Sequence, residues 1–329
     1  MADKPFPILF ITGTRIGDAV LASGLIKRLH DEIPHARFTI AAGPPAAPLF
    51  AETPNLDRVI VMAKRKWAGH WISLWNQVRA RRWGLIVDMR GSRVSDFLSR
   101  RRRAIYHRRP GAEPMHKVIE AAQVLGVEAD PPSPFLFTSA ETEAAAEALL
   151  GAGGPILAVA PGANWVGKTW PAERFAETAA RLLHHDGPLA NGRLLILGSS
   201  ADREAGRAVK LAISRDRVIA ADPGKLDLLT TYACLKRVRL FIGNDSGAMH
   251  LAAAAGAPTL GLFGPSDDRL YGPWGPDCRA VRGPRDLDAI RRSDPELNQA
   301  VCHMFDLSVE TVTDAAAALL KNTEARFAR

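Results

Sequence analysis

Strand-like and helix-like segments alternate along the whole chain, and this alternation constrains the fold more than any other feature. Such a pattern predicts α/β domains with parallel sheets and helices on both faces. The predicted strands cover Ile8–Thr12, Phe38–Ala42, Val59–Val61, Leu85–Val87, Ala104–Tyr106, Ile156–Ala160, Leu194–Leu197, Val218–Ile219, Leu240–Ile242 and Thr259–Phe263. The predicted helices cover Asp18–Ile33, Ile72–Arg82, His116–Leu125, Pro171–His184, Ala201–Ser214, Lys225–Lys236, Ser246–Ala255 and Val309–Lys321.

The length of 329 residues indicates two such domains. Residues 126 to 155 carry several prolines and glycines, so we expect the boundary there. This gives an N-terminal domain over 1–150, a second domain over 151–305 and a C-terminal helix over 306–329. Ligands bind doubly wound sheets at the carboxyl ends of the strands. We therefore expect two Rossmann-like domains whose binding loops face one cleft.

Positive charge is concentrated in one part of the chain. Lys and Arg exceed Asp and Glu by 43 − 35 = 8, and fourteen of these cations fall between residues 61 and 110, opposed by Asp88 and Asp96. Four tryptophans, Trp67, Trp71, Trp75 and Trp83, are interleaved with them. Such a patch attracts phosphate groups on a glycolipid, a membrane surface or a nucleic acid, and the alternative is an ordinary solvated surface.

No apolar run reaches the 18 residues that a membrane span needs, and the first residues lack a signal-peptide pattern. The three cysteines are far apart, which is typical of a reducing compartment without disulfides or a zinc motif. We therefore expect a cytoplasmic protein without a bound metal.

The loop after the predicted strand at 240–242 is the strongest candidate site. Asp245, Ser246, Gly247 and His250 cluster where that strand gives way to a helix of small residues. A helix start offers free N–H groups and partial positive charge, so it suits a phosphate group. The structural alternative is an Asp N-cap, a turn glycine and a core histidine.

Two further loops carry candidate residues. Asp18 follows Gly13 and Gly17 near the start of the first helix, where it is either a helix cap or a general base. The spacing of these glycines, without a ribose-binding acid after the next strand, disfavours a dinucleotide fingerprint. Asp202 follows another strand and is either a cap or a ligand for a ribose hydroxyl.

Residues 162–169 match the phosphate-loop pattern G-x-x-x-x-G-K-[ST] through Gly162, Gly167, Lys168 and Thr169. A P-loop ATPase also needs a strand-end aspartate for magnesium. Asp245 does not follow an apolar strand directly, because Gly243-Asn244 stand between them, and this disfavours it as the magnesium ligand. Pro171 indicates a helix that begins after the loop, which also disfavours a P-loop. We interpret Lys168 as phosphate-binding in either case, and an ATPase or kinase using this loop remains an alternative function.

Taken together, these motifs resemble the ADP-heptose:lipopolysaccharide heptosyltransferases of glycosyltransferase family 9. The residues that carry the resemblance, in chain order, are Arg15-Ile16-Gly17-Asp18, Pro161-Gly162-Ala163-Asn164 with Lys168 and Trp170-Pro171, Asp245-Ser246-Gly247-Ala248-Met249-His250, Phe263-Gly264-Pro265, and Cys302-His303-Met304. The resemblance implies the GT-B fold and inverting transfer of a sugar from an ADP-sugar to a lipopolysaccharide core acceptor. A GT-B enzyme that uses a UDP-sugar is a further alternative.

The resemblance also assigns roles. Asp18 matches the catalytic base and Lys168 the phosphate-binding lysine of the family. The donor residues implied are Gly162, Asn164, Lys168, Asp202, Leu226, Asp245, Ser246, Gly247 and His250. The acceptor residues implied are Arg15, Lys64, Arg65, Lys66, Arg93 and His116. The partners expected are a nucleotide-sugar donor and a phosphorylated glycolipid, with peripheral contact to the inner membrane, no nucleic acid and no cofactor.

Three features depart from the family's pattern. Ala163 and Asn164 stand where relatives often have hydroxyl residues, and Ala22-Ser23-Gly24 lacks a common proline. The run Arg100–Arg103 is heavier than we would expect for the family.

Overall fold

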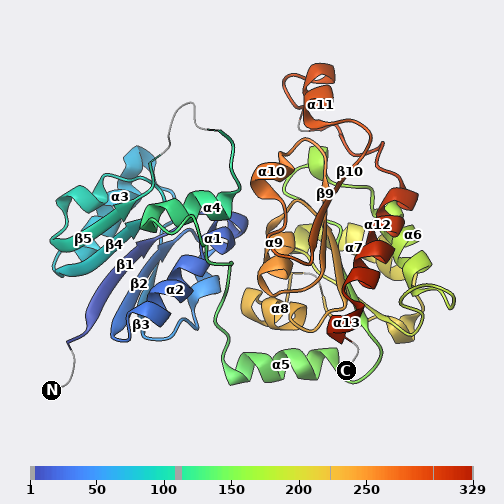
Figure 1. Cartoon of the computed structure of the whole chain (residues 1–329), viewed down its shortest axis with the longest axis horizontal. Coiled ribbons are helices and arrows are strands. Elements are labelled where there is room, and N and C mark those ends of the chain that lie inside the picture. The colour runs from blue at the N-terminus through green and yellow to red at the C-terminus, as the bar shows by residue number, and fades with distance from the viewer. Residues whose placement is uncertain (1–3, 108–112, 223, 299, 328–329) are drawn as a thin grey trace. The chain divides into compact units, whose positions relative to one another are not determined.

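The computed structural model describes residues 4–107, 113–222, 224–298 and 300–327 (Figure 1). It divides into two compact units, Met1–Ser139 and Ala140–Arg329. The division lies before α5 (Ala140–Leu150), whereas the sequence analysis assigned that helix to the first domain. Glu143 of α5 explains the difference, because its two carboxylate oxygens lie 2.6 Å from Lys236 Nζ and 2.6 Å from Arg237 Nη1 of the second unit.

The first unit contains a five-stranded parallel sheet in the order β3-β2-β1-β4-β5 within its described residues. Its strands are β1 (Phe6–Ile11), β2 (Ala36–Ala42), β3 (Leu56–Val61), β4 (Trp83–Asp88) and β5 (Arg100–Ile105). Its helices are α1 (Ile16–Leu21), α2 (Gly24–Glu32), η1 (Ala47–Phe50), η2 (Lys66–Ala68), α3 (Gly69–Val78), η3 (Val94–Phe97), α4 (Lys117–Ala122) and η4 (Gln123–Leu125).

Helices cover the first sheet where its side chains are apolar. Leu9, Ile11 and Ile86 form one core cluster with Leu74 and Val78 of α3, while α1 and α4 pack against each other. Strands buried on both faces read as continuous apolar runs, and this is why β1 and β4 were predictable.

The helix expected over Asp18–Ile33 is two helices instead, and that prediction is wrong. Ser23 Oγ donates to Val20 O at 2.7 Å and accepts from Phe135 N at 2.9 Å. A Cβ on Gly24 would lie 2.5 Å from Pro132 O and 2.4 Å from Ser133 O. The later segment therefore packs directly onto the break between α1 and α2, a contact that local sequence does not reveal.

The second unit contains another five-stranded parallel sheet, in the order β10-β9-β8-β6-β7 within its described residues. Its strands are β6 (Ile156–Ala160), β7 (Arg193–Ile196), β8 (Leu240–Asn244), β9 (Thr259–Phe263) and β10 (Cys278–Arg282). Its other helices are η5 (Val166–Lys168), α6 (Ala172–Leu183), η6 (Ser200–Asp202), α7 (Arg203–Leu211), η7 (Arg215–Arg217), α8 (Leu228–Leu235), α9 (Gly247–Ala254), α10 (Asp268–Tyr271), α11 (Leu287–Ser293), α12 (Val309–Asn322) and α13 (Glu324–Phe327).

Both faces of this sheet are covered. Leu157 and Val159 of β6 belong to a core cluster with α6, α7 and α12, so the C-terminal helix is part of the second unit's core. On β9, a Cβ at Gly261 would lie 2.4 Å from Met249 Sδ of α9. The predicted class, doubly wound parallel sheets in two Rossmann-like units, is confirmed.

β10 has no predicted counterpart, and one predicted strand is absent from the described part of the chain. β10 is an edge strand whose Arg279 and Ala280 are exposed, so it has no continuous apolar run. The strand expected at Val218–Ile219 reduces to a single bridge between Val218 and Leu194. None of the helices in the described part of the chain is both long and apolar enough to cross a membrane.

Candidate functional site

The second sheet has a topological switch point between β6 and β8. From β6 the chain winds outward to β7 in one direction and through β8, β9 and β10 in the other. Crevices at such points, outside the carboxyl ends of the strands, are where doubly wound sheets bind ligands. The loops that follow β6 and β8 are the ones that contain Lys168 and Asp245.

Lys168 and Asp245 meet at this switch point. Lys168 Nζ lies 3.0 Å from Asp245 Oδ2, and their side chains are only 13% and 9% exposed. His250 Nε2, one turn into α9, lies 4.0 Å from Asp245 Oδ1. The structure therefore brings together the lysine, aspartate and histidine that the sequence analysis selected from separate loops.

Ser246 is the N-cap residue of α9, but its hydroxyl makes no capping hydrogen bond. The Oγ atom is buried and has no hydrogen-bond partner among the described residues. The first N–H groups of a helix, here beginning at Gly247, have no partners inside the helix. This end of α9 therefore presents donors and partial positive charge beside Lys168, as a diphosphate site requires.

Two glycines bring the neighbouring loops into close contact. A Cβ on Gly162 would lie 1.9 Å from Asp202 Oδ1, and a Cβ on Gly224 would lie 2.4 Å from Ser200 N. Gly224 also has a φ of +84°, which favours glycine. Because Leu226 follows Gly224, the segment that leads into α8 lies beside the loop that contains Asp202.

Asp202 forms a capping box with Ser199. Its Oδ2 accepts from Ser199 N and Ser199 Oγ, each at 2.7 Å. Asp202 therefore takes part in a capping box at the start of η6 but makes no side-chain cap bond to α7, and the ribose role stays a prediction. Asn164 is exposed in the loop after β6, and Leu226 is half-buried.

Asp227, directly after Leu226, is the N-cap of α8. Its carboxylate accepts from Leu229 N at 3.0 Å and from Thr230 N at 2.9 Å. Desolvation raises the pKa of Asp227, but hydrogen bonds from Thr230 and the backbone outweigh it, so the net pKa is lowered.

We expect Asp227→Ala to lower the free energy of unfolding by about 1–2 kcal/mol at pH 7, as loss of an N-cap does. Because the pKa is lower in the folded state, this contribution is present above the unfolded pKa and is lost as the pH falls through the folded pKa. Urea unfolding of wild type and variant at pH 7 and below pH 3 measures both effects. An equal difference at the two pH values would contradict the charged-cap explanation.

The segment around Cys302 and Leu307 braces the Lys168 loop. Trp170 Nε1 donates to Leu307 O at 2.9 Å, and His303 N donates to Gly167 O at 3.0 Å. The Cys302 thiol contacts Thr169 O at 3.3 Å. The sequence analysis singled out Cys302-His303-Met304 without a role, and packing now gives it one.

The P-loop alternative is not favoured. α6 begins at Ala172 after Pro171, so Lys168 is not in its first turn, and the Thr169 hydroxyl donates to Trp165 O at 2.9 Å. The prediction that Gly243-Asn244 separate Asp245 from the end of its strand is wrong, however. β8 extends through Asn244, so Asp245 follows the strand directly.

Asp18 lies at the corresponding edge of the first sheet. The switch point there falls between β1 and β4, and Asp18 belongs to α1, which follows β1. The N-cap of α1 is Arg15, and Asp18 is the third helical residue, so Asp18 is not the N-cap residue. Its side chain is exposed, and a Cβ on Gly13 would lie 2.7 Å from Asp18 Cβ.

The predicted acceptor residues also lie in the first unit. Arg15, Lys64, Arg65, Lys66 and Arg93 are exposed. Lys64 and Arg65 follow β3, so they share the carboxyl edge of the sheet with Asp18. Arg93 lies on the turn after β4, 3.8 Å from Asp96.

His116 caps a helix, α4, that packs against the helix carrying Asp18, α1. Its Nδ1 accepts from Val118 N at 3.2 Å.

The interleaved tryptophans do not form one exposed face. Trp83 is buried in the core, Trp75 Nε1 donates to Phe97 O at 3.0 Å, and Trp71 packs against the core. Trp67 is 96% exposed. Arg108 and Arg109, counted in the basic patch, lie outside the described residues.

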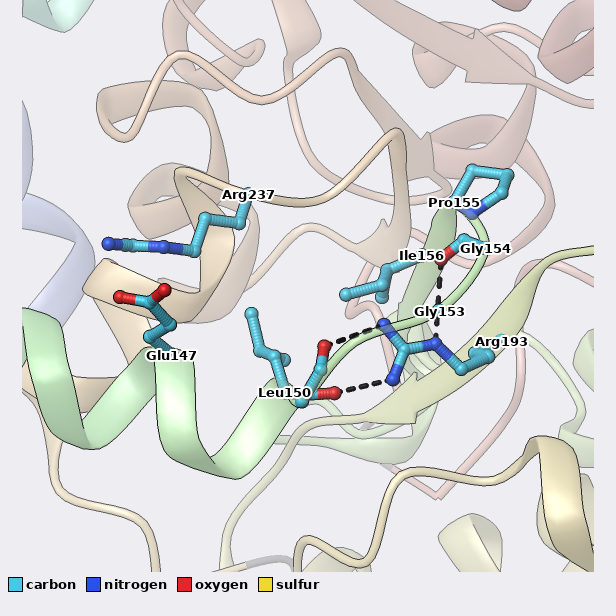
Figure 2. Close-up of a pocket in the computed structure, with 9 residues that line it drawn as sticks. Glu147, Leu150, Gly153, Gly154, Pro155, Ile156, Arg193 and Arg237 are labelled. Carbon is cyan, nitrogen blue, oxygen red and sulfur yellow. Dashed lines mark hydrogen bonds between the residues drawn. The ribbon is translucent and has the colours of Figure 1, made fainter.

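A separate depression of about 440 Å³ lies where α5 ends and β6 begins (Figure 2). Arg193 lines it and donates to Leu150 O, Gly151 O and Gly154 O. The guanidinium thus satisfies carbonyl groups at the end of α5. This depression lies at the amino edge of the second sheet, opposite the Lys168 loop.

One group of residues has metal-ligating potential within the described ranges. His184, His185 and Asp186 lie together after α6, all exposed. They belong to the amino edge of the second sheet, away from Lys168, so they do not contribute to the candidate site.

The comparisons with known proteins agree with this geometry. The sequence profile of glycosyltransferase family 9 (heptosyltransferase) matches residues 55–299. The chain is 23% identical to lipopolysaccharide heptosyltransferase 2 of Salmonella typhimurium, over 87% of this chain and 91% of that protein. It is 27% identical to lipopolysaccharide heptosyltransferase 1 of Pseudomonas aeruginosa, over 82% and 81%.

Solved structures share the fold. ADP-heptose lipopolysaccharide heptosyltransferase II of Escherichia coli superposes with a TM-score of 0.74 and 21% identity, covering 97% of this chain and all of that one (100%). E. coli WaaC with ADP superposes with a TM-score of 0.70 and 16% identity, covering 95% of this chain and 100% of that one. The profile match spans most of both units, so the chain is a glycosyltransferase and belongs to family 9, the heptosyltransferases.

Proposed function

We propose that this protein transfers heptose, with inversion, from ADP-heptose to a hydroxyl group of a lipopolysaccharide core acceptor. The observation that carries the proposal is the Lys168–Asp245 pair beside the start of α9, at the switch point of the second sheet. Relatives named for lipopolysaccharide heptosyl transfer support the sugar and the acceptor. Similar folds solved with ADP and with ADP-2-deoxy-2-fluoro heptose support the donor.

The proposed reaction is a single displacement. Asp18 takes the proton of the acceptor hydroxyl as its oxygen bonds to the anomeric carbon of the donor sugar. The bond between that carbon and the diphosphate oxygen breaks, and ADP leaves with the electron pair. Lys168 and the N–H groups at the start of α9 stabilise the charge that develops on ADP, so no metal ion is needed.

Two assays test this function. A thermal-shift panel of ADP, UDP, GDP and ATP identifies the nucleotide, because a ligand that binds only the folded state stabilises it by RT ln(1 + L/Kd), where L is the free ligand concentration. Transfer from ADP-heptose to lipopolysaccharide of a heptose-deficient strain is then measured with and without EDTA. We expect ADP to stabilise the protein more than UDP or GDP, and transfer to be unaffected by EDTA.

Each rival predicts a different result. A P-loop ATPase or kinase predicts EDTA-sensitive loss of the γ-phosphate of ATP without any acceptor. An enzyme that uses a UDP-sugar predicts that UDP gives the largest shift in melting temperature. Failure of transfer from ADP-heptose to every core acceptor tested would contradict the proposal.

We also propose peripheral contact of the first unit with an anionic membrane surface. Trp67 is 96% exposed, and Phe97 of η3, which contacts α3, is 66% exposed. Lys64, Arg65 and Lys66 adjoin Trp67 and are exposed. Exposed aromatic side chains beside basic residues are typical of proteins that bind the lipid interface.

Co-sedimentation with vesicles tests this contact. We expect binding to phosphatidylglycerol vesicles, weak binding to phosphatidylcholine vesicles, and loss of binding at high salt. Trp67→Ser should weaken binding to anionic vesicles by several-fold, since it removes an interfacial aromatic side chain. Equal sedimentation with both vesicle types would contradict the contact.

A further inference from the structure

The turn after β4 holds an arginine that the sequence analysis did not select. Asp88, 0% exposed at the end of β4, accepts from Arg90 N at 2.9 Å, Ser92 N at 3.0 Å and Ser92 Oγ at 2.5 Å. The turn is joined to β1 because Met89 N donates to Ile11 O at 2.8 Å. Arg90 is therefore fixed at the switch point of the first sheet, beside the Gly13–Asp18 loop.

The Arg90 side chain is positioned but carries no anionic partner. Its guanidinium lies 4.7 Å from the centre of the Trp71 ring, and Trp71 packs against the core. Within the described part of the chain no salt bridge joins this guanidinium to a carboxylate, and Asp88 acts on it only as a nearby charge. Burial lowers the pKa of Arg90 by more than the nearby Asp88 charge raises it. The group is still a cation, because arginine stays protonated in proteins.

We propose that Arg90 binds an oxyanion of the acceptor, a phosphate or a carboxylate, and so sets which acceptors are used. The guanidinium carbon lies over the Trp71 ring, and the guanidinium has five N–H donors in a fork that matches a planar or tetrahedral oxyanion. Because Arg90 and Asp18 follow neighbouring strands, an acceptor anchored at Arg90 presents a nearby hydroxyl to Asp18. This inference rests on the proposed function.

Binding of the acceptor without donor tests the site independently of transfer. Titration calorimetry uses lipopolysaccharide of a heptose-deficient strain with wild type, Arg90→Lys and Arg90→Gln. We expect the dissociation constant to rise about 10-fold in R90K, which keeps the charge but loses the two parallel N–H donors of the guanidinium. We expect a rise of about 100-fold in R90Q, which loses both. Arg82→Lys, an exposed arginine at the amino end of β4, is the matched control and should bind as wild type.

Modified acceptors identify the anion. Phosphatase treatment should weaken wild-type binding and abolish the difference between wild type and R90K if the ligand is a phosphate, and methyl esterification should do so if it is a carboxylate. Wild-type affinity in both R90K and R90Q would overturn the proposal. It would also be overturned if these variants lost the same affinity with phosphatase-treated and methyl-esterified acceptors as with the untreated acceptor. Failure of the proposed function is distinguishable, because it would leave wild type without transfer whatever the Arg90 variants bind.

A second inference concerns Asn244 in the other unit. Asn244 is 0% exposed at the end of β8. Its Oδ1 accepts from Trp170 N at 3.0 Å, and its Nδ2 donates to Pro161 O at 2.8 Å. One amide therefore joins both ends of the loop after β6 to the strand that precedes Asp245.

We infer that Asn244 is a positioning residue that holds Lys168 against the donor site. Lys168 lies between the two ends that Asn244 holds, and Asp245 is the next residue along the chain. The side chain offers one acceptor and one donor in the orientation that the loop requires. An aspartate has the same shape but cannot donate to Pro161 O, so it should release that end of the loop.

Asn244→Asp and the smaller Asn244→Ser test this role well below their melting temperatures. In the proposed mechanism Lys168 contacts the diphosphate of the donor. If Asn244 no longer holds the loop, Lys168 should both bind the donor more weakly and stabilise the charge on departing ADP less. We therefore expect the dissociation constant of ADP to rise about 10-fold and kcat to fall about 10-fold, with the acceptor KM unchanged.

The matched control is Thr259→Val. Thr259 is also 0% exposed, and its hydroxyl donates to Ala257 O at 2.8 Å. It is the first residue of β9, so it lies at the amino ends of the strands, whereas Asn244 lies at their carboxyl ends. T259V should lose stability without losing ADP affinity. Wild-type ADP affinity and kcat in both Asn244 variants, or an equal loss of ADP affinity in T259V, would overturn the inference. ADP titration needs no transfer, so this result is separable from failure of the proposed function.

Discussion

Asp18→Asn lowers kcat by about 10³-fold, within the range of 10² to 10⁴ that a general base contributes, and leaves the affinity for ADP unchanged. The amide has the shape of the carboxylate but cannot take the proton of the acceptor hydroxyl. The position supports a role in chemistry because Asp18 is exposed in the helix that follows β1, at the carboxyl edge of the first sheet. Single-turnover transfer and titration with ADP measure the two quantities separately.

Asp31→Asn is the matched control for this prediction. Asp31 lies in the same unit, on α2, and pairs with Lys27 at 2.5 Å on the surface. Loss of such an exposed pair changes stability by less than about 1 kcal/mol and should leave kcat at the wild-type value. Transfer by D18N at the wild-type rate would exclude Asp18 as the base, and a parallel loss of ADP affinity would indicate misfolding.

Lys168→Ala weakens ADP binding about 30- to 150-fold, because a buried charge-assisted hydrogen bond contributes about 2–3 kcal/mol. In the proposed mechanism Lys168 stabilises the charge on the departing ADP, so we expect the variant to lower kcat as well. A second effect complicates the single variant. Asp245, with a side chain only 9% exposed, loses its partner at 3.0 Å, and such a loss costs about 3–5 kcal/mol of stability.

The double variant Lys168→Met with Asp245→Asn separates binding from stability. It removes both charges, so the free energy of unfolding should recover toward the wild-type value. ADP affinity should remain low, because neither new side chain can donate a charge-assisted bond to a diphosphate. Recovery of ADP affinity in the double variant would show that Lys168 acts only through the ion pair.

The sequence alone was sufficient where the determinants are local. β6 and β9 coincide with the predicted strands, because strands buried on both faces are continuous apolar runs. β10 was missed because an edge strand has no such run, and the break before Gly24 depends on carbonyl groups more than 100 residues later. The start of α6 after Pro171 was predictable from proline's preference for helix starts.

The residues of the candidate site also divide into those that local sequence indicates and those that only the structure reveals. Asp18, Lys168, Asp245 and His250 were selected from residue type and loop position, whereas Arg90 and Asn244 have no local signal. Asn244 was interpreted as a spacer between a strand and Asp245, and only the structure shows that its amide bonds to residues 161 and 170. Arg90 is one arginine among many in a basic region, until Asp88 and Trp71 are seen to hold it.

The sequence by itself determined the alternating elements, the two-sheet class and the loops that carry chemistry, because hydrophobic period and turn residues act over a few positions. Only the tertiary structure decided the strand order, and with it which loops meet at each switch point. It also decided that Asp202 forms a capping box with Ser199, that Arg15 is the N-cap residue of α1, and that α5 packs with the second unit. These outcomes depend on contacts between residues distant in sequence, whose free energies no local pattern encodes.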